Sequence, residues 1–375
     1  MEKREKWAAV VITRPGWDQV RLLHRYRTMT VWLPKRFHDS GLLADEEVRY
    51  YAKPLSQWVR EVFHDYDHWI FVMSVSLATR LIAPVIRDKH RDPSVTVVDD
   101  GGHYAVCLLS CHAQDGNEIT RDIARILQAM PVITTGSESL EVPALDLIGR
   151  EGNWHLEDWA TLSHLSRMML EKDPVGVVQE SGSPCWRYRD SFSRIYDGWE
   201  YVPAPVFQEI RGWLWITHRR VSVPRQVEQA PILVYRPKVL SIGVGFSRNT
   251  TVEDLEEMVS ETLNTNHLSS HSVDTIVTID RKRGDGALEE WAQRHGWKLQ
   301  FVSPEELNRV PLNHRHFNPS VLEATGAYAV SEPAAILGAD GGSLLVSKCK
   351  SDRVTVAVAL KTAASRSWEP ENDSR

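Results

Sequence analysis

Two blocks of this sequence alternate short apolar segments with stretches of helical periodicity, and this alternation restricts the fold more than any other feature. In the first block, AAVVIT (residues 8–13) and HWIFVMSV (residues 68–75) stand among helix-period segments such as DGNEITRDIARILQAM (residues 115–130). In the second block, VLSIGVGF (residues 239–246) and VDTIVTID (residues 273–280) have the same apolar character. Strands that are apolar throughout are typical of parallel sheets with helices on both faces. The sequence therefore predicts an α/β protein with mostly parallel sheets.

A less regular segment between the two blocks divides the chain into domains. We predict an N-terminal α/β domain with flanking helices over residues 1–138 and a smaller middle domain over residues 139–236. A C-terminal α/β domain follows over residues 237–362, and the polar residues 363–375 are expected to be disordered. Within the middle domain, residues 181–208 are rich in turn formers and aromatics, which indicates a loop or a poorly packed insert.

Two further local predictions concern the C-terminal domain and its entrance. Residues 225–238 are expected to form a connector into this domain. Residues 331–339 are expected to form a short helix with Ser331 as its N-cap, because serine is a preferred capping residue.

Charge and cysteine content argue against several classes of protein. The net charge of −6 gives no reason to expect a nucleic acid partner, although a local basic patch could still bind a small anion. The 4 cysteines lack zinc-type spacing and are too sparse for a disulfide scaffold. The longest apolar stretch, residues 69–86, contains Arg80 and Pro84, so it indicates a strand and a helix rather than a membrane span. With no signal peptide pattern at the start, we predict a soluble, reduced, cytoplasmic protein.

A basic cluster in residues 80–93 includes Arg80 and Lys89. Charge runs of this kind usually form a solvated helix end and loop. The alternative is a local site for carboxylates, because ligands of α/β sheets bind at the carboxyl ends of the strands.

Asp99 and Asp100 end a predicted strand and are followed by Gly101 and Gly102. An Asp-Gly pair between two strands is a common hairpin signal, and this explanation needs no function. Two carboxylates at a strand end can also orient a histidine or act as a base, so both residues are candidates for catalysis.

The segment CLLSCHAQDGNEI (residues 107–119) combines Cys107, Cys111 and His112 with a helix start that contains Asn117. This spacing matches no standard zinc pattern, and Cys107 is expected to lie in a buried strand. We therefore predict no metal held by the protein here. A turn into a helix N-terminus is the better interpretation, since free backbone N–H groups favour an anion.

The C-terminal domain contains two further candidates. Lys282 lies in the loop after a predicted strand, and Glu332 lies at a helix start, where the dipole favours a carboxylate for structural reasons alone. The GVGF run at residues 243–246 lacks the third glycine of a dinucleotide fingerprint and does not support such a site.

Taken in order, several segments resemble the cobalt-precorrin-5A hydrolase (CbiG) family of the oxygen-independent cobalamin pathway. The matching pieces are TRLIAPVIRDKHRDPSVTVVDDGGHYAVCLLSCH, NEITRDIARIL, PVITT, LSIGVGF, TIDRK and YAVSEPAAIL. They extend over about residues 8–360, and their order and spacing together are more specific than any single piece. The chain departs from the family pattern at Cys111, where glycine is usual, and in the AQDGN run that replaces a glycine-rich segment.

The resemblance implies an enzyme that opens the δ-lactone of a cobalt-corrinoid intermediate and releases a two-carbon unit as acetaldehyde. The substrate carries its own cobalt, so no separate cofactor is implied, and its many carboxylates suit the basic cluster. The implied partner is this small molecule, without nucleic acid or membrane, while a homodimer stays open.

Lactone hydrolysis needs a base that activates water and donors for the developing oxyanion. With the resemblance, we predict His112 as the base, oriented by Asp99 or Asp100. The predicted substrate-binding residues are Arg80, Lys89, Asn117, Lys282 and Glu332. Two other functions stay open: a corrinoid-binding or carrier protein without catalysis, which the altered glycine motif allows, and a doubly wound protein that binds an unrelated anionic metabolite.

Overall fold

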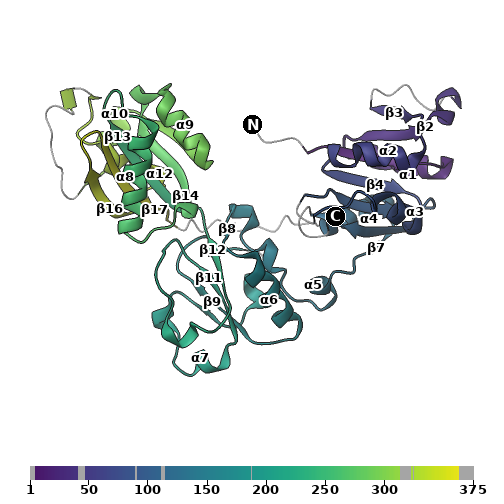
Figure 1. Cartoon of the computed structure of the whole chain (residues 1–375), viewed down its shortest axis with the longest axis horizontal. Helices are drawn as coiled ribbons and strands as arrows, with labels where there is room; N and C mark the ends of the chain where they lie inside the picture. The colour runs from purple at the N-terminus through teal and green to yellow at the C-terminus, as the bar shows by residue number, and fades with distance from the viewer. Residues whose placement is uncertain are drawn as a thin grey trace. The chain divides into compact units, whose positions relative to one another are not determined.

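A computed structural model describes residues 5–40, 47–88, 91–110, 115–186, 188–312, 322–323 and 325–362 (Figure 1). Contacts along the chain divide it into two compact units, Met1–Leu147 and Ile148–Arg375. The predicted disordered tail, residues 363–375, lies outside the described residues. Within the described part of the chain, no helix combines the length and the apolar character that crossing a membrane requires.

The described residues of the first unit form one sheet of seven strands, in the order β3-β2-β1-β4-β5-β6-β7. The strands are β1 (Trp7–Val11), β2 (Thr30–Pro34), β3 (Val48–Tyr51), β4 (His68–Val72), β5 (Ser94–Val98), β6 (Tyr104–Leu109) and β7 (Met130–Val132). Neighbouring strands are parallel except β5 and β6, which form an antiparallel hairpin. The predicted mostly parallel sheet is confirmed, and so is the hairpin explanation of the turn at Asp99–Gly102.

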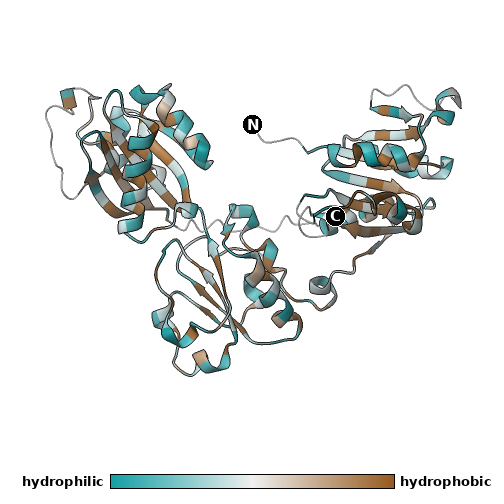
Figure 2. Cartoon of the chain, in the orientation of Figure 1, coloured by the Kyte–Doolittle hydropathy of each residue, from teal (hydrophilic) through white to brown (hydrophobic). Residues whose placement is uncertain are grey.

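Helices cover both faces of this sheet, because residues along each central strand point alternately to the two sides. The helices are α1 (Arg14–His24), α2 (Leu55–Val62), α3 (Val75–Ile82), α4 (Gly116–Leu127) and the short α5 (Gly136–Ser139). Ala9 and Val11 of β1 pack with α1 and α4, whereas Ala8 and Val10 pack with α2 and α3. The apolar strands and the polar outer sides of the helices can be followed in Figure 2.

The middle domain has its own sheet, in which five described strands lie in the order β10-β9-β11-β12-β8. They are β8 (His155–Leu156), β9 (Val175–Gln179), β10 (Ile195–Tyr196), β11 (Gly212–Ile216) and β12 (Ile232–Arg236), with α6 (Trp159–Leu170) and α7 (Val206–Glu209) beside them. The prediction of a poorly packed insert at residues 181–208 was wrong, because Trp199 and Val202 lie in one core with Trp213. The predicted connector at residues 225–238 likewise contains the strand β12.

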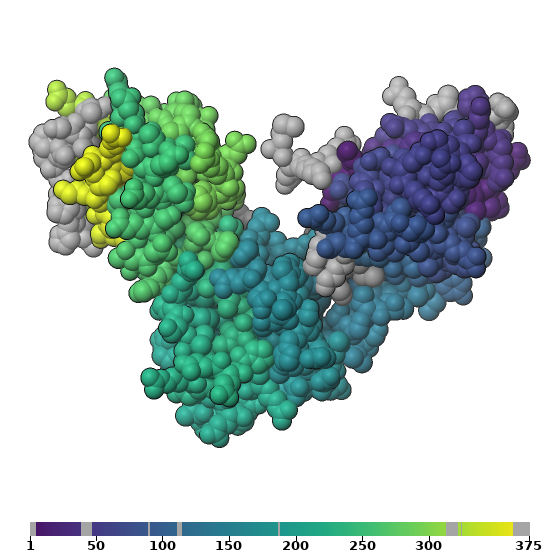
Figure 3. Space-filling model, viewed as in Figure 1, coloured from purple at the N-terminus to yellow at the C-terminus, as the bar shows by residue number. Residues whose placement is uncertain are grey.

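The C-terminal domain repeats the layered arrangement, with five described strands in the order β15-β14-β13-β17-β16. They are β13 (Leu240–Phe246), β14 (Val273–Ile279), β15 (Lys298–Val302), β16 (Ser343–Lys350) and β17 (Val354–Leu360). The helices α8 (Val252–Thr265) and α9 (Gly286–His295) pack in the largest core of this domain, while α10 (Pro304–Arg309) and α12 (Ser331–Gly338) pack in a separate one. The middle and C-terminal domains touch in the space-filling view (Figure 3), and backbone hydrogen bonds join them.

The helix α12 packs closely on β13, and its first turn differs from the predicted one at Ser331. A Cβ on Gly243 would come within 1.8 Å of the Ser331 carbonyl oxygen, so glycine is required where the helix crosses the strand. Ser331 is the first residue of α12 rather than its cap, and Val330 holds the cap position without a side-chain bond. The Ser331 hydroxyl is buried and has no hydrogen-bond partner among the described residues.

Candidate functional site

Polar groups gather at the carboxyl edge of the N-terminal sheet, where the strand order reverses. The chain adds β2 and β3 on one side of β1 and adds β4 and β5 on the other, so the reversal lies between β1 and β4. Thr13 follows β1, Ser74 follows β4, and Asp99 and Asp100 follow β5. Open α/β sheets bind ligands outside the carboxyl ends of their strands at such a point. This edge is therefore the candidate site.

Asp100 connects the end of β5 to the first turn of α1. The Thr13 hydroxyl donates a hydrogen bond to Asp100 Oδ1, and its oxygen accepts one from the Gly16 N–H at 3.2 Å. A Cβ on Gly16 would lie 3.1 Å from Asp100 Oδ1 and 2.8 Å from Val72, so glycine permits this close approach. The positive end of the α1 dipole favours a carboxylate at this place.

Asp99 holds the turn of the β5–β6 hairpin and orients His103. One oxygen, Asp99 Oδ1, accepts the Tyr104 N–H at 2.6 Å. The other, Oδ2, accepts the Gly101 N–H at 3.2 Å and lies 3.2 Å from His103 Nδ1. Burial is the largest single influence and raises the pKa of Asp99, but the hydrogen bonds from Tyr104, His103 and Gly101 together outweigh it and lower the pKa. Asp99 is therefore an anion at neutral pH.

His103 has the surroundings of a general base. Its side chain is 75% exposed, and a carboxylate holds its Nδ1. Such a carboxylate fixes the tautomer, so that Nε2 can take a proton from water. Gly101 makes room for the ring, because a Cβ there would lie 2.5 Å from His103 Cε1. Gly102 has φ of +71°, a left-handed conformation that glycine adopts without strain.

The antiparallel course of β6 takes the chain from this edge to the opposite, amino edge of the sheet. His112 lies outside the described residues, but Ser110 before it and Asp115 after it are placed. The Ser110 hydroxyl donates to the Asp92 carbonyl oxygen at 3.0 Å, just before β5 begins. A strand the length of β5 spans roughly 16 Å at about 3.3 Å per residue. The prediction that Asp99 or Asp100 orients His112 therefore finds no support in the sheet topology.

The other predicted residues of this unit that the structure describes, Arg80 and Asn117, do not lie at the carboxyl edge. Arg80 is exposed near the end of α3, which runs away from that edge, and Lys89 lies outside the described residues. Asn117 is buried at the start of α4, where its amide group donates to Thr135 Oγ1 at 3.1 Å. Its carbonyl oxygen Oδ1 has no hydrogen-bond partner among the described residues.

A second histidine–aspartate pair lies at the amino edge and has a different character. His64 Nε2 is 3.1 Å from Asp92 Oδ1. Asp92 is fully buried, and its Oδ2 accepts the backbone N–H groups of Arg87 and Asp88 at 2.8 and 2.9 Å. This carboxylate holds a loop in place, so the pair serves as a structural counterpart of Asp99 and His103.

In the C-terminal domain, Lys282 and Glu332 lie apart. The Lys282 ammonium is 4.1 Å from the centroid of the Phe246 ring and donates to the Ser247 carbonyl oxygen at 3.4 Å. Glu332 is buried, and its Oε1 accepts the Lys348 N–H of β16 at 3.1 Å. Lys282 follows β14, which β13 and β17 separate from β16, so the two side chains do not converge. Glu332 ties α12 to the edge strand of the sheet.

The described residues offer little for cysteine or metal chemistry. Cys107 is buried in β6, as predicted. No group of three or more His, Cys, Asp or Glu side chains in the described ranges is arranged to hold a metal ion. His103 was not paired with Asp99 from the sequence, although the Gly-Gly turn between these two residues was a visible signal of a hairpin that brings their side chains together.

Comparison with known proteins matches three consecutive parts of the chain to protein families. Residues 57–138 match a family described as Cobalamin synthesis G N-terminal, residues 143–237 match Cobalamin biosynthesis central region, and residues 240–359 match Cobalamin synthesis G C-terminus. A cobalt-precorrin-5A hydrolase of Priestia megaterium is 32% identical over 360 residues, which cover 96% of each chain. A cobalt-precorrin-5A hydrolase of Salmonella typhimurium is 26% identical over 96% of this chain and 98% of its own. A cobalamin biosynthesis protein G homologue from Sulfolobus solfataricus, solved by crystallography, is 17% identical with a TM-score of 0.36, over 95% of this chain and 97% of its own.

Proposed function

We propose that this chain, which belongs to the cobalt-precorrin-5A hydrolase family, hydrolyses cobalt-precorrin-5A in cobalamin biosynthesis. The observation that carries this proposal is the 32% identity to the Priestia megaterium hydrolase over 96% of both chains. The order of the three family matches along the chain supports it. Neither observation favours the alternative of a corrinoid carrier without catalysis.

The proposed reaction opens a δ-lactone and then releases acetaldehyde. Water adds to the lactone carbonyl, the ring C–O bond breaks, and the products of this step are a carboxylate and a hydroxyl on the two-carbon unit. Loss of the proton from that hydroxyl forms the C=O bond of acetaldehyde as the C–C bond to the macrocycle breaks. The electron pair stays on the macrocycle, which takes up a proton, so the overall change is addition of water and loss of acetaldehyde.

We assign the base to His103, held by Asp99, because this imidazole is open to solvent at the carboxyl edge of the sheet. Asp100 and Thr13 fix the start of α1 beside this imidazole-bearing edge. Arg36 donates to the Ile12 carbonyl oxygen at 2.8 Å beside this edge and is a candidate for a substrate carboxylate. His112, which lies outside the described residues, stays the competing base, and Arg80, Lys89, Asn117, Lys282 and Glu332 stay predictions for substrate contacts.

The cobalt ion arrives with the substrate, so we propose no cofactor held by the chain. We also propose that the protein works in the cytoplasm, which agrees with free thiols at Cys185 and Cys349.

The test is incubation of the full chain with cobalt-precorrin-5A, with acetaldehyde and the absorption spectrum of the corrinoid measured together. Acetaldehyde in proportion to substrate consumed is the expected result. A spectral change that saturates at one equivalent without acetaldehyde would overturn the proposal in favour of corrinoid binding. No change in either signal would leave a chain that acts on a different anionic metabolite.

A further inference from the structure

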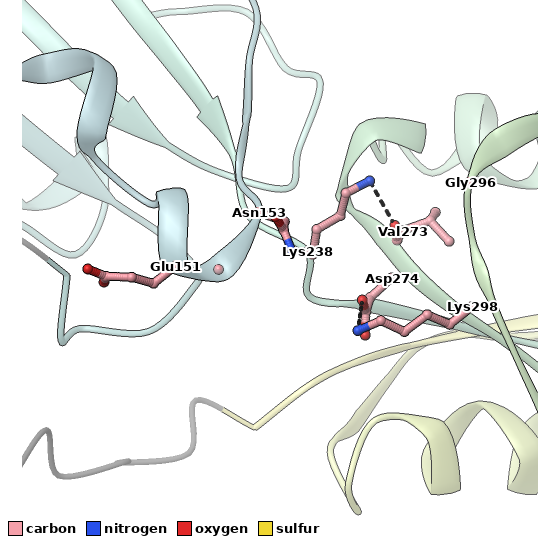
Figure 4. A pocket seen from close by; sticks show the side chains of 8 residues that line it. Glu151, Asn153, Lys238, Val273, Asp274, Gly296 and Lys298 are labelled. Carbon is pink, nitrogen blue, oxygen red and sulfur yellow. Dashed lines mark hydrogen bonds and ion pairs between the residues drawn. The ribbon is translucent and has the colours of Figure 1, made fainter. Parts of the chain in front are cut away.

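A pocket of about 370 Å³ lies where the middle domain meets the C-terminal domain (Figure 4). The middle domain contributes Glu151 and Asn153, from the one-turn helix η4 (Arg150–Gly152) and the residue after it. The C-terminal domain contributes Lys238, Asp274 and Lys298, which stand at the amino ends of β13, β14 and β15. The pocket is thus built from polar side chains of the second unit and takes none from the N-terminal sheet.

Positive charge exceeds negative charge in this pocket. Asp274 is shared between two ammonium groups, because Lys298 Nζ lies 3.0 Å from Oδ1 and Lys361 Nζ lies 2.6 Å from Oδ2. Lys238 is a third cation, and no carboxylate of the described residues forms an ion pair with it. Figure 4 shows the Glu151 side chain extending away from the two lysines. Of the lining groups, the ammonium groups of Lys238 and Lys298 therefore face one nearby carboxylate, Asp274, since Lys361 does not line the pocket.

Lys238 has hydrogen-bonding capacity that the protein does not use. Its ammonium donates to the Val273 carbonyl oxygen at 3.2 Å. An ammonium has three N–H donors, so two are left for another acceptor. Burial is the main influence on Lys238 and lowers its pKa, which means that the charged group has lost part of its hydration. An anion in the pocket would replace the hydration that the lysine gives up.

The neighbouring histidines and arginine leave the charge of the pocket unchanged, because burial lowers the pKa of His155 and His271 and Arg236 is paired. His155 and His271 stack with their ring centroids 3.8 Å apart across the border of the two domains. The nearby Arg236 already pairs with Glu157 at 2.6 Å, so that carboxylate is not available to Lys238. The border is therefore suited to a negatively charged ligand and unsuited to a cation.

We propose that this pocket binds a small oxyanion ligand, a di- or tricarboxylate or a phosphate, through Lys238 and Lys298. Its volume lies in the range of small-molecule sites. The ligand would contact both domains, since Asn153 of the middle domain lines the pocket together with the lysines of the C-terminal domain. Two sources offer this chemistry, a free anion or a carboxylate arm of a corrinoid. The proposal stands independently of the hydrolase reaction, because binding alone is measured.

The experiment follows the melting temperature of the full chain during titration with citrate or inorganic phosphate, at an ionic strength held constant with sodium chloride. A ligand that binds the folded state raises the melting temperature in a saturable way. We expect Lys238→Gln and Lys298→Gln each to weaken the anion about tenfold, the effect of losing a charged hydrogen bond. Lys350→Gln is the matched control, since Lys350 is an exposed lysine at the opposite end of the same sheet.

Two results would overturn the proposal: no saturable rise in the wild type beyond that with sodium chloride, or a Lys298→Gln response equal to the wild type. Lys298 is 72% exposed, so its replacement leaves the fold intact even where Lys238→Gln loses the bond to Val273. A cobalt corrinoid with free carboxylates then separates the two sources. A corrinoid response that weakens in Lys298→Gln identifies a substrate arm, and an unchanged corrinoid response with a lost citrate response identifies a free anion.

Discussion

The carboxyl edges of the N-terminal sheet and the middle sheet occupy equivalent places in two mostly parallel sheets, yet their polar residues have opposite surroundings. At the first edge, Asp99 and His103 are open to water. At the second edge, Glu180 follows β9, Thr217 and His218 follow β11, and these groups are buried. The comparison shows that a place at strand ends offers polar groups, and that exposure decides whether a ligand can reach them.

The polar groups of the middle sheet satisfy one another. Glu180 accepts hydrogen bonds from Thr217 Oγ1 at 2.5 Å and from Arg219 Nη2 at 2.6 Å. Burial is the largest influence on Glu180 and raises its pKa, but the bonds from Arg219 and Thr217 outweigh it and lower the pKa. The C-terminal domain then covers this edge, since the Ser269 N–H donates to the His218 carbonyl oxygen at 2.8 Å. The second edge therefore joins domains, whereas the first is free to bind a substrate.

The largest effect that would test this contrast is on turnover. His103→Ala should lower kcat by about a hundredfold or more, because general-base catalysis contributes factors of this size. His64→Ala is the matched control, a histidine paired with an aspartate at the amino edge, and it should change kcat less than about twofold. Acetaldehyde release measures both. If His112→Ala lost turnover while His103→Ala kept it, the base would be His112 and the contrast would fail.

The second prediction concerns stability against pH at the closed edge. Burial, the largest influence, lowers the pKa of His218 from 6.5 to about 4, with Arg219 and Arg236 acting in the same direction and Glu180 against it. Between these pH values the unfolded chain binds more protons than the folded chain, so stability falls as pH falls, by about 3 kcal/mol in total. Denaturant unfolding from pH 7 to pH 4 measures it.

His218→Gln supplies the control for this pH dependence, because it removes the imidazole and keeps a polar side chain of similar size. Its unfolding free energy should lose this part of the pH dependence. An identical slope in the wild type and the variant would show that other groups cause the loss of stability.

A third, smaller effect compares the two acids directly. Glu180→Gln weakens a charged hydrogen-bond network in a buried place and should cost about 2 kcal/mol of unfolding free energy. Asp100→Asn lies at the open edge and should cost less than about 1 kcal/mol, the size of a helix-dipole interaction. Urea unfolding of both variants gives the difference. Equal losses would mean that the first edge is as structural as the second.

The smallest effect concerns added metal. If the only metal of the reaction is the cobalt of the substrate, a chelator such as EDTA should change turnover less than about twofold. The measurement is acetaldehyde release with and without chelator, with added zinc as a reversal control. A loss that zinc restores would show that the chain itself holds a metal.

The regular parts of the fold were predictable because their periodicity is strong. β4 is apolar throughout, and the amphipathic α4 was placed from Asp115 onward by its pattern. The middle domain was misjudged because β8 and β10 have only 2 residues each, too few for any period to be seen. Its core depends on tryptophans such as Trp199 and Trp213, which meet across a long sequence distance.

The candidate site was half predictable. Asp99 and Asp100 were expected at a strand end and lie there. The prediction of His112 as their partner stays untested, because His112 lies outside the described residues, whereas the Asp-Gly signal of a hairpin already pointed to His103 as a neighbour of Asp99. An antiparallel strand after Gly102 keeps His103 beside Asp99 and takes the segment before His112 to the far edge. The direction of a strand depends on which strand it pairs with. In a single sequence, the only local sign of an antiparallel pairing is the short turn that joins the two strands.

The border between the middle and C-terminal domains has a consequence for how the chain could be divided. Only Pro237, Lys238 and Val239 lead covalently from β12 to β13, while the other described links across the border are noncovalent, such as the short bridge between Arg219 and Leu268. A cut at this peptide would free two fragments with their own sheets and expose the surfaces that had held them together. The two exposed surfaces are complementary, so separately expressed fragments should bind each other and restore the enzyme.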